Sequence, residues 1–213
     1  MNQVSKLQQL QNLSYFGKST LSQYMDLSDN SLYANIKRWQ KRGELIQLKK
    51  GFYVTAEFYK KLPNKEIYLE FISNRLKEPS YLSLEYVLQK YGVVSEAIYS
   101  FTSVTLKSRG TFINKLGTFL YRHLKENLFS GYQLKELGGF TIKEATKSKA
   151  LFDYLYFRNF RNQIIDKETL RSYRLNLDEL KQKDFQEFST YCEMTKVKKY
   201  QNLLNLLKEA YAL

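Results

Sequence analysis

The sequence predicts an α+β protein made of two parts, and three observations lead to that class. Between Thr20 and Val54, two helix-like segments are followed by two short strand-like segments. Between Ile98 and Ile142, short alternating runs are separated by turn residues, as in a small antiparallel sheet. From Ala145 onward, apolar residues recur at helical spacing. We therefore expect a small N-terminal domain and a mixed α/β C-terminal domain whose last third is helical.

The longer helix of the N-terminal part is predicted from Asp29 to Arg42. Its buried face is an apolar stripe at helical spacing, formed by Leu32, Ile36 and Trp39. A shorter helix, Thr20–Met25, precedes it, and a turn that begins at Asp26 leads to Ser28 at the N-cap position. Gly43 stands where a glycine commonly ends a helix.

Two predicted strands follow this helix, Leu45–Leu48 and Phe52–Val54, and Lys49-Lys50-Gly51 joins them. The order helix, turn, helix and two-stranded hairpin is that of a winged helix-turn-helix. In such domains the second helix lies in the major groove of duplex DNA. The sequence therefore predicts that the N-terminal domain binds DNA.

The outward face of the longer helix carries short polar residues first and long cations last. A recognition helix enters the groove by its N-terminal half, and asparagine can pair with adenine, so we expect base contacts from Asn30, Ser31 and Asn35. We expect phosphate contacts from the cations of the helix and the hairpin, namely Arg38, Lys41, Arg42, Lys49 and Lys50. For any single residue, the alternative is the solvated face of an amphipathic helix.

The charge of the chain suits a polyanionic partner. Its 213 residues carry a formal net charge of +13, and the pI is near 9.5. Residues 1–55 account for +5 and the remainder for +8, so the rest of the chain also suits nucleic acid or an acidic protein. A generally basic proteome is the alternative explanation. The one cysteine, Cys192, excludes an internal disulfide and fits a reducing compartment.

The residue inventory argues against an enzyme and against a bound cofactor or metal. One histidine, His123, and one cysteine are too few for a His/Cys zinc site. The sequence has no glycine-rich phosphate loop, no GxSxG motif and no HExxH motif. It also shows neither the apolar core of a signal peptide nor an apolar run long enough to span a membrane. We therefore expect a cytoplasmic protein.

Three segments are expected along the chain: a DNA-binding domain at 1–56, a connection at 57–78 and a C-terminal domain at 79–213. A first helix at 3–13 would complete the N-terminal core with Val4, Leu7, Leu10 and Leu13. The connection contains a helix that Asn64 caps and Pro79 ends, which is either the bridge between the two domains or part of the second one.

The C-terminal domain begins with a helix that Ser83 caps and Gly92 closes. Predicted strands cover 98–106, 111–113, 118–124, 131–137 and 140–142, with a hairpin turn at Lys115-Leu116-Gly117. Predicted helices cover 147–157, 167–173, 178–193 and 196–212. Strand 118–124 mixes polar and apolar residues on both faces, which suits a core on one side and a recognition surface on the other. The cations that we would test first for partner recognition are Lys107, Arg109, Arg122 and Lys125.

A series of short motifs runs through residues 79–132. They are Ser80-Tyr81-Leu82-Ser83-Leu84-Glu85, Tyr91-Gly92, Thr102-Ser103-Val104-Thr105, Gly117-Thr118-Phe119, Tyr121-Arg122-His123 and Phe129-Ser130-Gly131-Tyr132. This series, with residues 145–153 beyond it, resembles the AbiEi-type antitoxins, which are the antitoxin members of bacterial abortive-infection toxin–antitoxin pairs. The family usually has Pro-Glu before Lys-Ala, where this chain has Lys147-Ser148.

The resemblance implies an N-terminal winged helix that represses its own operon at inverted repeats, an arrangement that suits a dimer on DNA. It also implies a C-terminal domain that counters a nucleotidyltransferase-like toxin, directly or indirectly, in phage defence. Two other readings stay open. One is a stand-alone winged-helix regulator whose C-terminal domain senses a ligand or dimerises. The other is a nucleic-acid-modifying enzyme with a winged-helix targeting domain.

Overall fold

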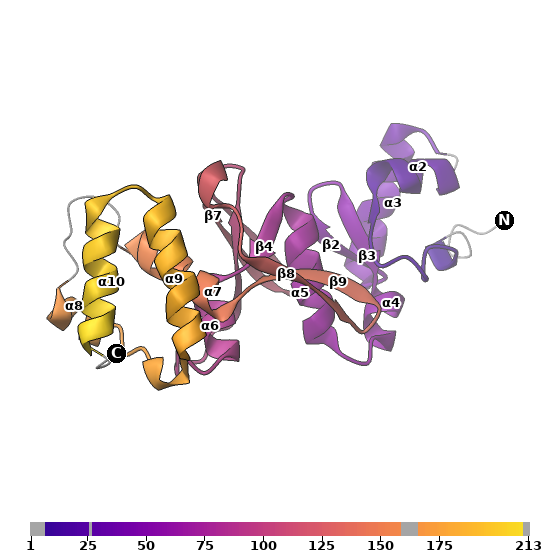
Figure 1. Cartoon of the computed structure of the whole chain (residues 1–213). Helices are drawn as coiled ribbons and strands as arrows, with labels where there is room; N and C mark the ends of the chain where they lie inside the picture. The colour runs from indigo at the N-terminus through magenta and orange to yellow at the C-terminus, as the bar shows by residue number, and fades with distance from the viewer. Residues whose placement is uncertain (1–6, 26, 159–165, 211–213) are drawn as a thin grey trace. The chain divides into compact units, whose positions relative to one another are not determined.

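The computed structural model describes residues 7–25, 27–158 and 166–210, and it is an α+β protein over these ranges (Figure 1). The chain divides into two compact units. Unit 1 comprises Met1–Leu69 and Phe112–Gly117, and unit 2 comprises Glu70–Thr111 and Thr118–Leu213. The boundary therefore falls inside helix α5 (Lys65–Leu76), whose start is capped by the Asn64 side chain as the sequence predicts.

Unit 1 contains a three-stranded antiparallel sheet in the order β1-β3-β2, formed by Phe16–Gly17, Phe52–Thr55 and Leu45–Lys49. Its helices are α2 (Lys18–Met25), α3 (Asp29–Arg42) and the short α4 (Ala56–Lys61). The predicted helix at 29–42 and the two strands of the hairpin are confirmed. Strand β1 was not expected, because two residues are too few to leave a pattern in the sequence.

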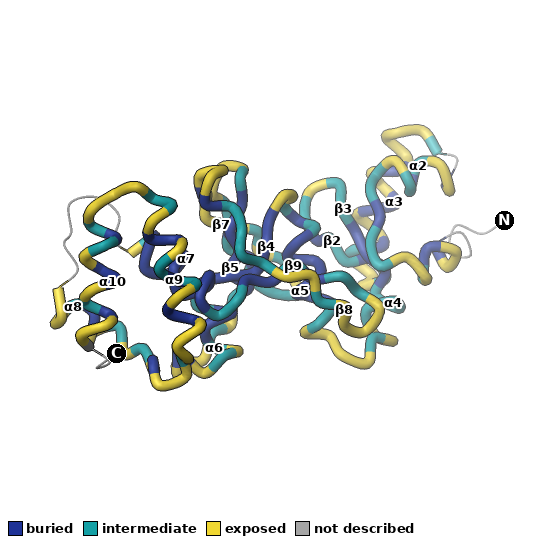
Figure 2. Tube along the Cα trace, in the orientation of Figure 1, coloured by how far each residue is buried: buried dark blue, intermediate teal, exposed yellow. Residues whose placement is uncertain are grey.

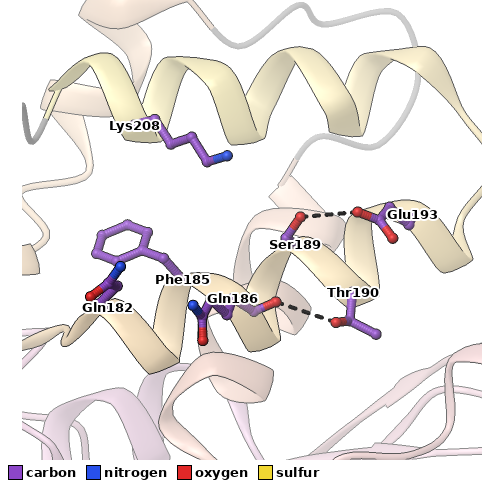
Figure 3. A pocket seen from close by; sticks show the side chains of 7 residues that line it. All are labelled: Gln182, Phe185, Gln186, Ser189, Thr190, Glu193 and Lys208. Carbon is purple, nitrogen blue, oxygen red and sulfur yellow. Dashed lines mark hydrogen bonds between the residues drawn. The ribbon is translucent and has the colours of Figure 1, made fainter. Parts of the chain in front are cut away.

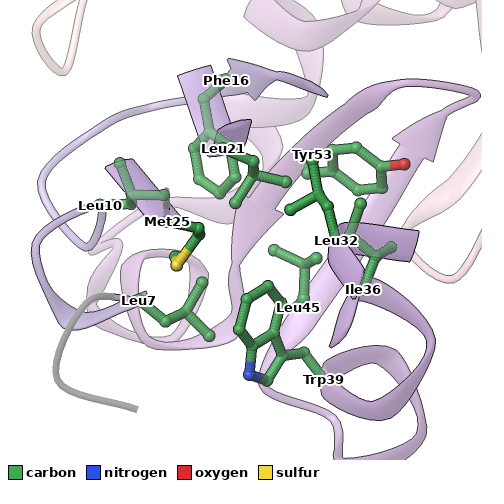
Figure 4. Packing of buried hydrophobic residues seen from close by; sticks show 10 residues of the cluster. All are labelled: Leu7, Leu10, Phe16, Leu21, Met25, Leu32, Ile36, Trp39, Leu45 and Tyr53. Carbon is green, nitrogen blue, oxygen red and sulfur yellow. The ribbon is translucent and has the colours of Figure 1, made fainter. Parts of the chain in front are cut away.

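The core of unit 1 is a cluster of apolar side chains from the helices and the sheet (Figure 4). It consists of Leu7, Leu10, Phe16, Leu21, Met25, Leu32, Ile36, Trp39, Leu45 and Tyr53. Burial of the predicted stripe of α3 is thus confirmed. The expectation for Leu13 is wrong, since 37% of this residue is exposed. Residues 3–6 of the predicted first helix, with Val4, lie outside the described residues.

The two ends of α3 differ in how well the sequence predicted them. Gly43 has a φ of +73°, and its N–H and that of Glu44 bond to the last carbonyls of the helix. Ser28 occupies the N-cap position, but its hydroxyl donates to the Ser31 hydroxyl at 3.1 Å and does not cap the helix. Asp26, the expected start of the turn, lies outside the described residues.

The second sheet has six strands in the order β6-β7-β5-β4-β9-β8. Its strands are Gly110–Asn114 (β6), Gly117–His123 (β7), Ser100–Thr105 (β5), Ser80–Leu82 (β4), Phe140–Ala145 (β9) and Tyr132–Leu137 (β8). Strand β5 is parallel to β7, and β4 is parallel to β9. The sheet is therefore mixed, and the expectation of a small antiparallel sheet is wrong.

Strand pairing explains this error. After β5 the chain passes to the outer edge as β6 and returns as β7, so that β7 runs parallel to β5. Alternation along the sequence locates such strands, but it does not tell which strands are neighbours. Strand β4 was missed because its three residues lead directly into helix α6 (Leu84–Lys90).

The remaining helices of unit 2 are α7 (Lys147–Arg158), α8 (Lys167–Ser172), α9 (Gln182–Met194) and α10 (Lys198–Ala210). Short 3₁₀ turns at Glu126–Leu128 (η1) and Leu177–Glu179 (η2) accompany them, so the predicted helix at 178–193 begins too early. Helix α7 packs against α6 and α9 and is buried along nearly its whole length (Figure 2). Among the described helices, none combines the length and apolar character needed to cross a membrane.

Candidate nucleic-acid interface

Helix α3 has one exposed face that is polar and basic. The residues opposite its buried stripe follow one another at helical spacing, and all are exposed: Asn30, Tyr33, Ala34, Lys37 and Lys41. Tyr33 leaves 48% of its surface accessible although it is a large ring. A helix of this kind offers amide, aromatic and ammonium groups on one side while its other side is fixed in an apolar core.

The sequence reasoning missed Tyr33, Ala34 and Lys37 on this face. The signal was available, because Asn30, Ala34, Lys37 and Lys41 are spaced by four, three and four residues, opposite the stripe that contains Trp39. The other predicted helix residues, Ser31, Arg38 and Arg42, are exposed as expected. Whether any of these residues touches DNA stays a prediction.

Asn35 is the exception, and its expected outward orientation is wrong. Only 3% of the residue is exposed. Its amide nitrogen donates to the Ser31 carbonyl at 2.8 Å, and its amide oxygen accepts a hydrogen bond from Arg38 at 2.8 Å. Asn35 is spaced three residues after Leu32 and four before Trp39, so the helix turns it toward the core regardless of its polarity. It therefore orients the Arg38 guanidinium and is not available to a base.

The N-terminal ends of α2 and α3 are tied together by an ion pair. Lys18 Nζ lies 3.1 Å from Asp29 Oδ2 and 4.3 Å from the centre of the Tyr33 ring. The hydrogen bond to Asp29, and then that to Tyr33, raise the pKa of Lys18. The pair neutralises the acidic group in the first turn of α3, so the exposed face of the helix keeps a net positive charge.

The hairpin between β2 and β3 presents its two lysines differently. Lys50 is exposed, and Gly51 beside it has a φ of +74°, which a glycine adopts without strain. Lys49 is half-buried, with its Nζ 5.1 Å from the centre of the Phe52 ring and 5.9 Å from that of Phe112. The two lysines therefore differ in exposure, and a phosphate contact from either one stays a prediction.

The four cations expected on the C-terminal domain are all exposed and come from one end of two parallel strands. Lys107 and Arg109 follow β5, whereas Arg122 is the last residue but one of β7 and Lys125 follows that strand. Thr105 pairs with His123 in the sheet, and the His123 ring bonds to the Lys107 carbonyl at 3.2 Å. We call Lys107, Arg109, Arg122 and Lys125 the β5–β7 basic cluster.

Unit 2 also buries an ion pair that sequence reasoning did not find. Lys149 and Asp153 are both fully buried on α7, and Lys149 Nζ lies 2.5 Å from Asp153 Oδ1. Asp153 Oδ2 accepts hydrogen bonds from the Ser83 hydroxyl at 2.7 Å and the Tyr81 hydroxyl at 3.0 Å. The Ser83 side chain therefore donates its hydrogen bond to this pair and does not cap α6. Burial raises the pKa of Asp153 and lowers that of Lys149.

A second buried network joins α5, α6 and the β8–β9 hairpin. Glu144 accepts from Lys90 and Lys135, each at 2.5 Å, and Glu70 accepts from Lys90 and the Tyr86 hydroxyl, each at 2.6 Å. Burial lowers the pKa of Lys90, but its hydrogen bonds to the two carboxylates outweigh this and leave the pKa raised. Every charged member has a partner of opposite sign, so the network stabilises the fold.

Unit 2 contains grooves between secondary-structure elements. One of about 460 Å³ separates α9 from α10, with Lys208 facing a row of α9 side chains that includes Phe185 and Ser189 (Figure 3). Ser189 and Glu193 bond to each other across one turn of α9 at 3.1 Å. The described residues contain no group of three or more His, Cys, Asp or Glu side chains placed to hold a metal ion.

Comparisons with known proteins leave the family open. No protein-family model matches the chain, and no curated protein is significantly similar to it. The resemblance to AbiEi-type antitoxins therefore depends on the short motifs of residues 79–132 and 145–153.

Proposed function

We propose that the protein binds duplex DNA through α3 and represses its own promoter. In this proposal α2, α3 and the β2–β3 hairpin form a winged helix-turn-helix, with α3 in the major groove and the hairpin against a phosphate backbone. The observation that carries the proposal is the exposed row Asn30, Ala34, Lys37 and Lys41, on a helix whose opposite side is buried.

Each group in this row has a chemistry that suits DNA. An exposed asparagine near the start of the helix can pair with an adenine edge, and an alanine methyl can contact a thymine methyl. Lys37 and Lys41 lie further along the same face, where ammonium groups can reach phosphates or guanine. The formal charge of +13 adds long-range attraction to a polyanion.

Binding is tested by fluorescence anisotropy with DNA from upstream of the protein's own gene and with a scrambled duplex. If about five phosphates are neutralised, a plot of log affinity against log salt should have a slope of about −4 to −5. The double variant Lys37→Ala/Lys41→Ala should bind more weakly and flatten that slope by about 2. The matched control is Lys196→Ala/Lys198→Ala, which removes two exposed lysines from unit 2. Equal affinity for both duplexes would overturn promoter recognition.

We also propose that unit 2 acts as the antitoxin toward a nucleotidyltransferase-like partner. This half is supported by the motif resemblance and by the β5–β7 basic cluster, whose four exposed cations come from one end of two paired strands. The alternative is a stand-alone regulator whose second unit senses a ligand or dimerises. The two readings differ in whether a toxin gene lies beside this one.

Co-expression with the adjacent gene tests the antitoxin proposal. Arg122→Glu/Lys125→Glu should lose growth rescue and keep promoter binding, whereas Lys37→Glu/Lys41→Glu should do the reverse. Full-length variants are preferable to fragments cut near residue 78. Such a cut separates Glu70 and Ser73 on α5 from Lys90 and Tyr121, to which they are hydrogen-bonded. Rescue that depends on Lys37 and Lys41 would mean that neutralisation works through DNA binding.

A further inference from the structure

Strand β8 ends the six-stranded sheet, so one of its sides has no strand beside it among the described residues. Its other side pairs with β9 in an unbroken antiparallel register from Tyr132–Ala145 to Leu137–Phe140. A free edge of this length presents unused backbone N–H and C=O groups, which is how sheets recruit a further strand.

The register shows which backbone groups of β8 point to the free edge. On β9, the N–H and C=O of Lys143 both bond to the Asn74 side chain, at 2.6 and 3.2 Å, and so point away from β8. Lys143 is the partner of Leu134, which makes this a pair without hydrogen bonds. Groups alternate along the strand, so the N–H and C=O of Tyr132, Leu134 and Glu136 face the free edge. The bond from Thr146 N–H to the Gly131 carbonyl agrees with this alternation.

The side chains of β8 leave this edge open. Leu134 is 64% exposed, and Leu137 and Glu136 beside it are exposed as well. Natural edge strands are protected by proline, by bulges or by charged side chains, lysine above all. Strand β8 has no proline and no bulge. Its one lysine, Lys135, is ion-paired to Glu144 on β9 at 2.5 Å, and Glu136 accepts a hydrogen bond from Thr141 on β9 at 2.6 Å.

We propose that a second copy of this chain pairs with β8 through its own β8, antiparallel, with the two Leu134 residues opposite each other. In this register, the three residues whose backbone groups face the free edge all have partners. Leu134 lies opposite Leu134 of the second copy, and each Tyr132 lies opposite a Glu136. A register centred on Lys135 would oppose two lysines, and one centred on Gln133 would leave Glu136 without a partner. The strand is therefore complementary to itself in one register, which favours a second copy over an unrelated strand.

The size of the contact sets its strength. A strand of this length extends over roughly 20 Å, and the added pairing buries less than the roughly 1,200 Å² of a stable interface. The dimer is therefore weak and depends on protein concentration. A trapping experiment is better suited to it than gel filtration alone.

Cysteine trapping in the full-length protein tests both the partner and the register. Leu134→Cys should form a disulfide-linked dimer under mild oxidation, because Cα atoms of opposed residues lie about 5.5 Å apart. Glu136→Cys should not, because its two copies would be separated by four residues, about 14 Å along the strand. Ile113→Cys is the control for random collision, since Ile113 is 77% exposed on the opposite edge strand β6. The natural Cys192 is buried and serves as the unreactive background.

Sedimentation equilibrium of untrapped protein supplies the second measurement. Leu134→Lys should raise the dimer dissociation constant at least about tenfold, since it opposes two charges at the centre of the contact. Leu134→Pro should do the same without breaking the β8–β9 ladder, because the N–H that it removes faces the free edge. A protein that stays monomeric at the highest concentration, and in which the three cysteine variants crosslink equally, would overturn the proposal. Pairing of β8 with a different protein, with no self-association, would also overturn it.

Discussion

The two units of this chain bury polar groups in opposite ways. Among the described residues, the buried polar side chains of unit 1 are the uncharged Asn35 and Thr55, in a core that is otherwise apolar. Unit 2 buries three carboxylates that are ion-paired to lysines, Glu70, Glu144 and Asp184, and the fully buried pair Lys149–Asp153. An apolar core loses stability with the volume removed, whereas a buried ion pair loses most when one member is left alone. The same kind of substitution should therefore act differently in the two units.

The single tryptophan makes this comparison measurable. Trp39 lies in the core of unit 1, and the sequence contains no other tryptophan. Tryptophan fluorescence therefore follows the unfolding of unit 1, while far-ultraviolet circular dichroism follows both units. Urea unfolding recorded by both signals assigns a change in the free energy of unfolding to one unit.

The largest effect is expected for Asp153→Asn, which leaves Lys149 without a charged partner in a fully buried site. Removing one member of a buried ion pair costs about 3–5 kcal/mol, and the loss should appear in circular dichroism and not in the Trp39 signal. The double variant Lys149→Met/Asp153→Leu should recover much of this loss, because no charge is then buried. A double variant as unstable as the single one would mean that the hydrogen bonds of Ser83 and Tyr81 matter more than the charge.

The corresponding change in unit 1 is Leu32→Ala. Leu32 lies on α3 and is completely buried in the core of unit 1. The substitution should therefore cost about 2–5 kcal/mol and shift the Trp39 transition. Lys37→Ala, on the exposed face of the same helix, is the matched control and should change stability by less than about 0.5 kcal/mol. Equal costs would show that the helix has been assigned the wrong buried face.

The sites of these two substitutions also differ in whether the sequence predicts them. The stripe with Leu32 and Trp39 predicted the helix, its buried face and its end at Gly43, because apolar periodicity follows directly from the side chains. The pair Lys149–Asp153 was not foreseen, since its partners Tyr81 and Ser83 lie about seventy residues earlier and meet it only in the folded sheet. Asn35 is a different case, because its spacing from Leu32 and Trp39 already places it inward and only its polarity suggested an outward position. The site was thus predictable where it depended on helical phase and not where it depended on strand pairing.

Alkaline pH should lower the free energy of unfolding more in unit 2 than in unit 1, and this effect is smaller than those of the two substitutions. Burial raises the pKa of the Cys192 thiol to about 12, and it also raises the pKa of Tyr81, Tyr191 and Tyr200 in unit 2. Above the ordinary thiol pKa of 9.0, the unfolded chain loses protons that the folded chain keeps, so unfolding becomes easier as pH rises toward 12. Below pH 9 this contribution to stability is complete.

The free energy of unfolding should therefore fall from pH 9 upward, and Cys192→Ala should make the fall less steep. Within the part of the chain that the structure describes, unit 1 has two buried tyrosines whose pKa burial raises, Tyr53 and Tyr68. These are fewer groups than in unit 2, so the Trp39 transition of unit 1 should respond less. Equal alkaline sensitivity of both signals would contradict the comparison.

Two asparagines of α3, Asn30 and Asn35, should affect DNA affinity in different ways. Asn30→Ala should cost about 1–3 kcal/mol on the promoter and little on scrambled DNA, because it removes the base contact that we propose. Asn35→Ala should weaken binding to both duplexes by a similar factor, because it frees the Arg38 guanidinium that Asn35 now orients. Anisotropy titrations on the two duplexes decide between these outcomes. A promoter-specific loss for Asn35→Ala would mean that α3 rearranges on binding.

The smallest effect concerns the two hairpin lysines, which differ in exposure although they are neighbours. Lys50→Ala should reduce the salt slope of promoter binding by about 1, as expected when one phosphate contact is lost. Lys49→Ala should change the slope less, because the Lys49 ammonium lies 5.1 Å from the centre of the Phe52 ring and is half-buried. Both slopes are measured by anisotropy between low and physiological salt with identical DNA. If Lys49→Ala flattens the slope as much as Lys50→Ala, then Lys49 leaves the ring when the hairpin meets DNA. In that case cation–π contact, worth about 0.5–1 kcal/mol at an exposed site, is too weak to hold the ammonium against a phosphate.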